Sequence, residues 1–174
     1  MNIMIRTVKE SDAAAIAEIY RHYVENTAVS YEYTAPDARE ILSRINNTLK
    51  NYPYLVAEIN GETVGYAYAG AFKARKAYER SVETSIYVKD DFHGVGVGKS
   101  LYTELEKELQ KQGITNMYAC IAYPEKEDEY LNFNSRRFHE RMGFRLVGTF
   151  SKCAYKFGRW YGMIWMEKFI GEHN

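Results

Sequence analysis

The chain has 174 residues, with 23 basic and 23 acidic side chains and therefore a formal net charge of zero. At 20.2 kDa it is long enough to form a full hydrophobic core. No composition break, linker or repeat divides it, so we expect a single domain over residues 1–174. The even charge balance argues against a nucleic-acid-binding protein, which normally carries a basic excess.

Cysteine content and hydropathy exclude further classes. Cys120 and Cys153 are too few for a disulfide scaffold or a four-thiolate zinc site, and we expect packed thiols rather than nucleophiles. No stretch approaches the ~18 apolar residues of a membrane-spanning helix, and the N-terminus is too short in apolar length for a signal peptide. We therefore expect a cytoplasmic protein without a metal ion that binds neither membrane nor nucleic acid.

The first third of the chain predicts two helices and three strands. Residues 3–8 have the pattern of a strand, and apolar positions recur at helical spacing after Ser11, which we expect to cap the helix. A second helix is predicted to begin near Pro36. Residues 54–59 and 62–68 form a predicted hairpin, because Asn60-Gly61 supplies the two positive φ angles that a type I′ turn needs.

A further strand over 82–88 places Glu83, Ser85 and Tyr87 on the face opposite Val82 and Ile86. A glycine-rich turn follows, and then a helix with leucines spaced by four that ends at Gly113. The remaining predicted elements are a strand over 116–121, a helix over 134–142, and strands over 144–151 and 160–169. This order indicates a mixed α/β fold around a central sheet.

The turn from His93 to Ser100 lies between a strand and a helix start, where free backbone N–H groups and the helix dipole favour an anion. Two familiar phosphate motifs fail on counting. A P-loop needs glycine where His93 stands, and the G-x-G-x-x-G spacing of dinucleotide-binding proteins is absent from either starting glycine.

The turn instead matches [QR]-x-x-G-x-[GA] at Gly96 and Gly98, with His93 in the first position. This is the pyrophosphate loop of the GNAT superfamily of N-acetyltransferases, whose order of elements the chain also shares. The chain resembles in particular the phosphinothricin acetyltransferase-like branch. Four separated segments carry that resemblance: residues 75–78, 82–88, 139–144 and 156–160. It implies a central, mostly antiparallel sheet with splayed fourth and fifth strands, flanked by helices.

The resemblance also implies an activity. The protein would move the acetyl group of acetyl-CoA directly to the primary amine of a small amino-acid-like acceptor, through a ternary complex and as a homodimer. A peptide N-terminus or another small amine is an alternative acceptor. A non-catalytic acyl-CoA-binding protein is the alternative from another class.

Amine acetylation needs a base, because a protonated amine has no lone pair for attack. By the resemblance Glu83 is the candidate, whereas as an ordinary residue it would be a solvated carboxylate, for example pairing with Arg80. His139 is expected to protonate the leaving thiolate near neutral pH or to contact the CoA sulfur. The alternative proton donors are three tyrosines: Tyr118, Tyr123 and Tyr130.

The resemblance assigns cofactor contacts to two parts of the chain. On the strand, Ile86 and Val88 would pair with the pantetheine arm, and the Val88 N–H would be the oxyanion donor. Asn132 would hold the pantetheine amide, although the long connection 123–130 makes Asn134 an alternative; that acidic connection is expected to be a solvated charge run. The full predicted set is Ile86, Tyr87, Val88, His93, Gly94, Val95, Gly96, Val97, Gly98, Lys99, Asn132 and Ser135.

Three residues are candidates for acceptor binding. Arg75 would hold an acceptor carboxylate, which matches the planar fork of its guanidinium, and Tyr78 and Tyr31 would line the same pocket. Gly162 stands where the branch usually has a polar residue, so any contact there is expected to be absent. Arg159-Trp160 is expected to serve structure or dimer contacts.

Overall fold

The computed structural model describes residues 2–174 and contains one seven-stranded sheet in the order β1-β2-β3-β4-β5-β7-β6. The strands are β1 (Met4–Thr7), β2 (Tyr54–Ile59), β3 (Glu62–Ala71), β4 (Ser81–Val88), β5 (Asn116–Tyr123), β6 (Arg145–Lys156) and β7 (Arg159–Phe169). The helices are α1 (Ala13–Asn26), α2 (Ala38–Leu49), α3 (Val97–Lys111) and α4 (Asn134–Arg141). This confirms the predicted mixed α/β order. In the described range no helix is both long and apolar enough to cross a membrane.

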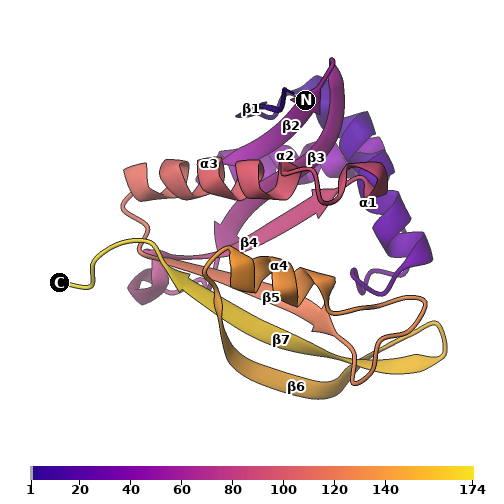
Figure 1. The fold of residues 1–174 in the computed structure, drawn as a ribbon. Helices are drawn as coiled ribbons and strands as arrows, with labels where there is room; N and C mark the ends of the chain where they lie inside the picture. Colours follow the sequence, from indigo (N-terminus) through magenta and orange to yellow (C-terminus); the bar gives the residue numbers. More distant parts are fainter. Residues whose placement is uncertain (1) are drawn as a thin grey trace.

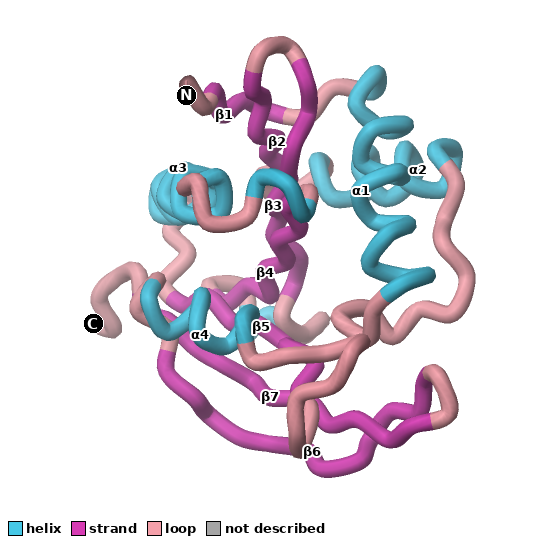
Figure 2. Tube along the Cα trace, turned by 45° about the vertical axis from the view of Figure 1, so that its right-hand side comes forward, coloured by secondary structure: helices cyan, strands magenta, loops and turns pink. Residues whose placement is uncertain are grey.

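The helices cover the sheet on both faces (Figure 2). α1 and α2 pack on one face of β2 and β3, where Ile16, Ile45 and Val56 are fully buried. α3 packs on the other face with Leu101 and Leu105 in the core, and α4 lies on that same side, over β5 and β7. We call these two sides the α1/α2 face and the α3/α4 face.

The parallel pair β4 and β5 is joined only at its beginning. Ser81–Glu83 pair with Asn116–Tyr118, and beyond Glu83 the two strands run apart (Figure 1). This confirms the expected splayed fourth and fifth strands. The divergence opens a gap in the middle of the sheet and leaves main-chain groups of both strands without a partner strand.

Turn residues confirm one local prediction and correct another. Asn60 and Gly61 have φ angles of 51° and 81°, as the type I′ hairpin turn requires. The cap predicted at Ser11 is wrong. Asp12, not Ser11, accepts the N–H of Lys9 at 2.7 Å, and a 3-10 turn (Glu10–Asp12) precedes α1. Asp12 is also paired with Arg6, which fixes the start of the helix to β1.

Candidate active site

Main-chain groups of β4 point into the gap between β4 and β5. The Lys89 N–H donates to the Val64 carbonyl at 2.9 Å. Because hydrogen-bonded residues alternate along an antiparallel strand, the residues of β4 that bond β3 are Tyr87, Ser85 and the other odd-numbered positions. The N–H and C=O groups of Ile86 and Val88 therefore face away from β3. Since β5 has already diverged, the N–H groups of both residues are available to a strand-like ligand.

The glycine-rich turn builds a cradle of N–H groups at the start of α3. The first helical bond of this helix runs from the Ser100 N–H to the Gly96 carbonyl at 3.0 Å, so the preceding N–H groups have no partner within the helix. Gly94 and Gly96 have φ angles of 78° and 98°, which side-chain-bearing residues rarely adopt. A Cβ at Gly94 would meet only open space. The loop backbone is therefore open to a diphosphate on this side.

The side chain of His93 has a different role from the backbone of its loop. Its Nε2 lies 2.9 Å from the Val88 carbonyl and 3.0 Å from the Tyr23 hydroxyl. Tyr23 also donates to the Val88 carbonyl. Tyr23 and His93 thus both donate to the end of β4 and hold it against α1. Through these hydrogen bonds the His93 ring also fixes the start of the loop to α1.

Glu83 lies at the point where β4 and β5 separate, half-buried, on the α1/α2 face. Burial raises the pKa of this carboxyl above 4.5, while the charge of Lys73 lowers it. Within residues 2–174 no hydrogen-bond donor contributes to the pKa of Glu83, and the pairing with Arg80 considered above is not formed. The carboxylate is therefore free to accept a proton from a bound molecule.

His139 corrects the expectation of a histidine that titrates near neutral pH. It is only 3% exposed, and its burial lowers its pKa to about 4. Its Nδ1–H donates to the Ser135 carbonyl at 2.7 Å, which leaves Nε2 to accept from the Tyr102 hydroxyl at 2.9 Å. A neutral ring with both nitrogens engaged fixes α4 to α3 and has no spare proton for a thiolate.

The three alternative tyrosines lie in different surroundings. Tyr123 packs on the α3/α4 face, and its hydroxyl accepts a hydrogen bond from Arg136 at 2.8 Å. Tyr118 belongs to the opposite face, where its ring stacks on Phe72. Tyr130 stacks on Phe157 of the β6–β7 turn. Of the three, Tyr123 shares the side of the sheet on which the N–H cradle lies.

Tyr78, one of the predicted acceptor residues, lies on the α1/α2 side of the gap, on which Tyr118 and Glu83 also lie. Phe72, which sequence reasoning missed, stacks on Tyr118 with ring centroids 4.3 Å apart and meets Tyr78 edge-on at 5.9 Å. Arg75 is exposed in the same β3–β4 connection. The structure thus brings Tyr78, through Phe72 and Tyr118, to the neighbourhood of Glu83. Within residues 2–174 the Arg75 side chain makes no hydrogen bond or ion pair with this group.

Tyr31 lies across the same face, in the connection between α1 and α2. Its hydroxyl donates to the Gly162 carbonyl. A side chain at Gly162 would collide with the Phe150 carbonyl, because residues 151–153 form an irregularity in β6 at this point. This accounts for the glycine and agrees with the expected absence of a side-chain contact there.

Lys156 is a further residue that the sequence pattern did not single out. Its ammonium is buried and donates to the carbonyls of Val24, Thr27 and Ser30 at 2.6–2.9 Å. These carbonyls end α1 and begin the connection that carries Tyr31. The β6–β7 hairpin therefore holds the acceptor side of the site in place. The bonded residues are 126–132 positions apart in the sequence, so no local sequence pattern predicts this contact.

The connection 123–130 is not the solvated charge run that we expected. The Asp128 carboxylate accepts from the N–H groups of Tyr130 and Leu131 and from the Tyr161 hydroxyl. Glu129 forms a bidentate salt bridge with Arg159, in which both N–O distances are 2.7 Å. Arg159 thus has the expected structural role, and the connection is an ordered loop.

Asn132 and Asn134 are both exposed at the start of α4. The side-chain oxygen of Asn132 accepts the Asn134 N–H at 2.9 Å, so it helps begin the helix. Its side-chain NH2 remains available on the α4 side of the gap, two turns from His139.

The two cysteines are a second correction, because both are exposed rather than packed. The Cys120 sulfur lies 3.4 Å from the Met163 sulfur. Although the residue as a whole is exposed, surrounding protein atoms desolvate its sulfur and, with the nearby charge of Glu83, raise the pKa of Cys120 to about 11. A thiol with this pKa is protonated at neutral pH, which supports the expectation that it is not a nucleophile.

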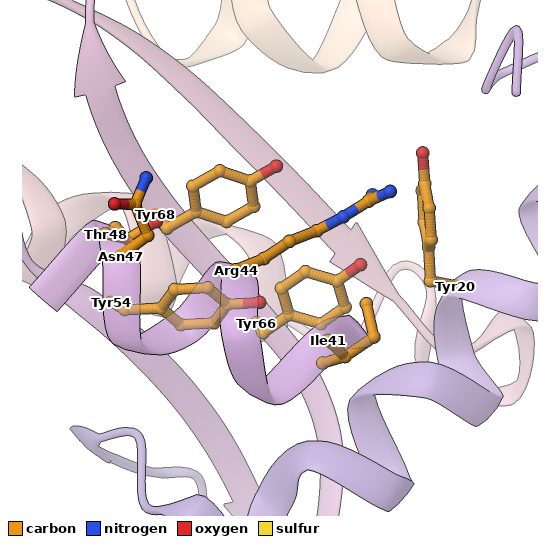
Figure 3. Close-up of a pocket in the computed structure, with 8 residues that line it drawn as sticks. All are labelled: Tyr20, Ile41, Arg44, Asn47, Thr48, Tyr54, Tyr66 and Tyr68. Carbon is orange, nitrogen blue, oxygen red and sulfur yellow. The ribbon is translucent and has the colours of Figure 1, made fainter. Parts of the chain in front are cut away.

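A cavity of about 240 Å³ lies between α2 and the tyrosines of β2 and β3 (Figure 3). Arg44 is the one basic side chain in its lining. Its guanidinium is already paired with Glu32 at 2.8 Å and with Glu40 at 3.0 Å. The cavity therefore offers no free cation for a carboxylate, and Arg75 keeps that assignment.

Comparison with known proteins identifies the fold and its chemistry. A family model described as an acetyltransferase (GNAT) domain matches residues 5–165. Phosphinothricin N-acetyltransferase of Streptomyces viridochromogenes is 34% identical over 168 residues, which cover 96% of this chain and 88% of the relative. The L-methionine sulfoximine/L-methionine sulfone acetyltransferase of Salmonella typhimurium is 34% identical, with 97% and 95% covered.

A solved structure gives the same result. A GNAT superfamily phosphinothricin acetyltransferase from Sinorhizobium meliloti, in complex with acetyl-CoA, superposes with a TM-score of 0.89 at 35% identity. The match covers 98% of this chain and 90% of that chain.

Proposed function

Because the chain belongs to the GNAT family of acetyltransferases, we propose that it moves the acetyl group of acetyl-CoA directly to the primary amine of a small amino-acid-like acceptor within a ternary complex. One observation carries the proposal. An unpaired, half-buried carboxylate, Glu83, lies on one side of the gap between β4 and β5, and the N–H cradle of α3 lies on the other. A donor and an acceptor can therefore meet in the gap.

Acetyl-CoA supplies an activated thioester when it is bound, and the residues of this chain would orient it. The backbone from His93 to Lys99 would hold the diphosphate, and the main-chain groups of Ile86 would bond the pantetheine arm along β4, which leaves the Val88 N–H for the acetyl end of the cofactor. Asn132, just before α4, and Ser135, in its first turn, would contact the cofactor from the α4 side of the gap. The support for this assignment is the direction of the unpaired main-chain groups and the two positive φ angles in the loop.

Glu83 would remove the proton from the acceptor ammonium, directly or through a water molecule. Its raised pKa suits a general base better than an ordinary glutamate pKa would, since the gain in basicity eases proton abstraction. The Val88 N–H would donate to the oxygen of the tetrahedral intermediate. Direct attack by the amine needs no acyl-enzyme, in line with the protonated state of Cys120.

Tyr123 would donate the proton to the leaving thiolate. Its hydroxyl accepts from Arg136, which leaves its own hydrogen available and stabilises the charge that develops on the oxygen. It also lies on the α3/α4 face. His139 would then act through Tyr102 and Ser135, as the residue that holds α4 beside the gap.

We assign the acceptor to the amino-acid class because Arg75 can receive a carboxylate and because relatives over the whole chain are named for phosphinothricin and for methionine derivatives. Tyr31 and Tyr78 would line the acceptor side. A peptide N-terminus is less well supported, since it has no free carboxylate next to its amine.

We also propose that the protein forms a homodimer. Large apolar side chains are exposed on β6 and at the start of β7, where Val147, Phe150 and Trp160 are 56%, 52% and 60% exposed. β6 is the last strand of the sheet, and an exposed apolar edge of this kind is suited to burial against a second copy.

A thiol-release assay with a panel of amines tests the proposal. We expect CoA release from acetyl-CoA with carboxylate-bearing primary amines such as phosphinothricin, and little with amines that lack a carboxylate. Calorimetric titration with acetyl-CoA separates the alternatives. Binding without release with any amine would favour an acyl-CoA-binding protein, and no binding would refute both.

A further inference from the structure

A small hollow adjoins Glu83 on the acceptor side of the sheet. Gly70 of β3 is paired with Glu83 of β4, so a side chain at position 70 would stand on the same face as the carboxylate. A Cβ built on Gly70 would meet no atom within 4 Å. The protein thus leaves empty the position immediately beside its candidate base.

The backbone does not explain this glycine. Its φ lies outside the left-handed range in which side chains are disfavoured, and no neighbouring chain approaches closely. Glycine in a strand interior weakens the strand and commonly marks a bulge or a close approach of another group. The register around Gly70 is regular, so neither a bulge nor a close approach of another chain segment accounts for the glycine.

Aromatic residues flank Gly70 along the chain. Tyr68 of β3 and Phe72, which directly follows β3 and still pairs with Ser81, are two residues before and after Gly70 and alternate onto the same face. The Tyr68 ring stacks on Tyr54 at 4.8 Å, and the Phe72 ring stacks on Tyr118 at 4.3 Å. Both rings are thus held by stacking on residues of other strands, Tyr54 of β2 and Tyr118 of β5.

We propose that the Gly70 hollow receives the substituent on the amine-bearing carbon of the acceptor, so that Gly70 determines acceptor size. The inference rests on the proposed function. An amine within reach of Glu83 places its carbon beside the carboxylate, and the Gly70 position is the open space on that side. The aromatic rings of Tyr68 and Phe72 on this face suit the methylene part of an amino-acid side chain.

The acceptor class that follows is an α-amino acid with an unbranched side chain. Glycine would leave the Gly70 position empty, whereas an acceptor with a side chain would fill it. Filling the hollow from the protein side should therefore exclude side-chain-bearing acceptors and spare glycine.

The test compares Gly70→Val with the wild-type enzyme, with phosphinothricin and glycine as acceptors in the thiol-release assay. We expect kcat/KM for phosphinothricin to fall at least tenfold more than kcat/KM for glycine, and the KM for acetyl-CoA to change less than twofold. Ala71→Val is the matched control, because it adds a similar bulk at an exposed position on the opposite face of the same strand. Ala71→Val should leave kcat/KM unchanged for both phosphinothricin and glycine.

Gly70→Ala guards against a folding defect, since its Cβ enters open space and should give a smaller loss with the same selectivity. An equal loss with both acceptors, or no loss with phosphinothricin, would overturn the inference. A wild-type enzyme that releases no thiol with any amine would instead refute the proposed function, and the inference with it.

Discussion

The two sides of the gap between β4 and β5 use different parts of the chain. On the α3/α4 side the available groups are mainly backbone N–H groups, set by strand alternation and by the start of a helix. On the α1/α2 side the groups are side chains from separate segments, with Glu83 on β4, Phe72 after β3 and Tyr31 after α1. A site made of backbone groups depends less on side-chain identity, whereas a site made of side chains can change specificity without changing the fold.

The largest effect is expected on the acceptor side, from Glu83→Gln. Losing a general base typically lowers the rate by about 10²- to 10⁴-fold, and we expect a fall in this range in kcat/KM. The affinity for acetyl-CoA should stay nearly unchanged, because Glu83 faces away from the cradle. Wild-type levels of turnover in this variant would remove Glu83 from the mechanism.

The pH dependence of kcat/KM in the wild-type enzyme is a second test of Glu83 as the general base. The carboxyl must be deprotonated to act, and its pKa is raised above 4.5 by burial. The value of kcat/KM should therefore fall as the pH decreases through a pKa above 4.5, and Glu83→Gln should abolish that limb of the profile.

On the cofactor side, Gly96→Ala should weaken acetyl-CoA binding about tenfold, because a side chain at a φ of 98° costs roughly 1–2 kcal/mol in the loop that forms the cradle. Gly113→Ala is the matched control. It places the same substitution at a φ of 77° beyond the other end of α3, where a Cβ meets no atom within 4 Å; at Gly96 a Cβ makes only an ordinary contact with Ile3 at 3.9 Å. Calorimetry should show lost affinity for the first variant only. Equal losses of affinity in both variants would indicate that the substitutions act through protein stability, and would argue against a role of the loop in binding.

Arg75→Ala should raise the KM for carboxylate-bearing amines about fivefold, since an exposed ion pair contributes up to about 1 kcal/mol. Lys76→Ala, an exposed neighbour with the same charge, should have little effect. The same increase in KM for amines without a carboxylate would exclude the proposed role of Arg75.

The smallest effect is expected from His93, because Tyr23 still donates to the Val88 carbonyl when the ring is removed. His93→Ala should raise the KM for acetyl-CoA by roughly two- to threefold, the effect of a few tenths of a kcal/mol. His93→Gln retains a donor and should restore the wild-type value. If glutamine behaves like alanine, the contact with Val88 does not position the loop.

Sequence patterns predicted the elements well and the side-chain partners poorly. The register of the Asn60-Gly61 hairpin and the leucine spacing of α3 follow from residues close together in the chain, and both are observed. The burial of His139 could not be predicted, because its partner Tyr102 lies 37 residues away on another helix. The order of the acidic connection likewise depends on Arg159, about 30 residues further on.

The sequence by itself determined the order of strands and helices, the glycine loop and the family, since these depend on spacing along the chain and on φ angles that few residues adopt. Only the tertiary structure decided the protonation and partners of the site residues. It lowered the pKa of His139, raised that of Glu83 and left the space beside Gly70 open. Each of these depends on which distant side chains exclude water from a group, and a pattern of neighbours in the chain does not carry that information.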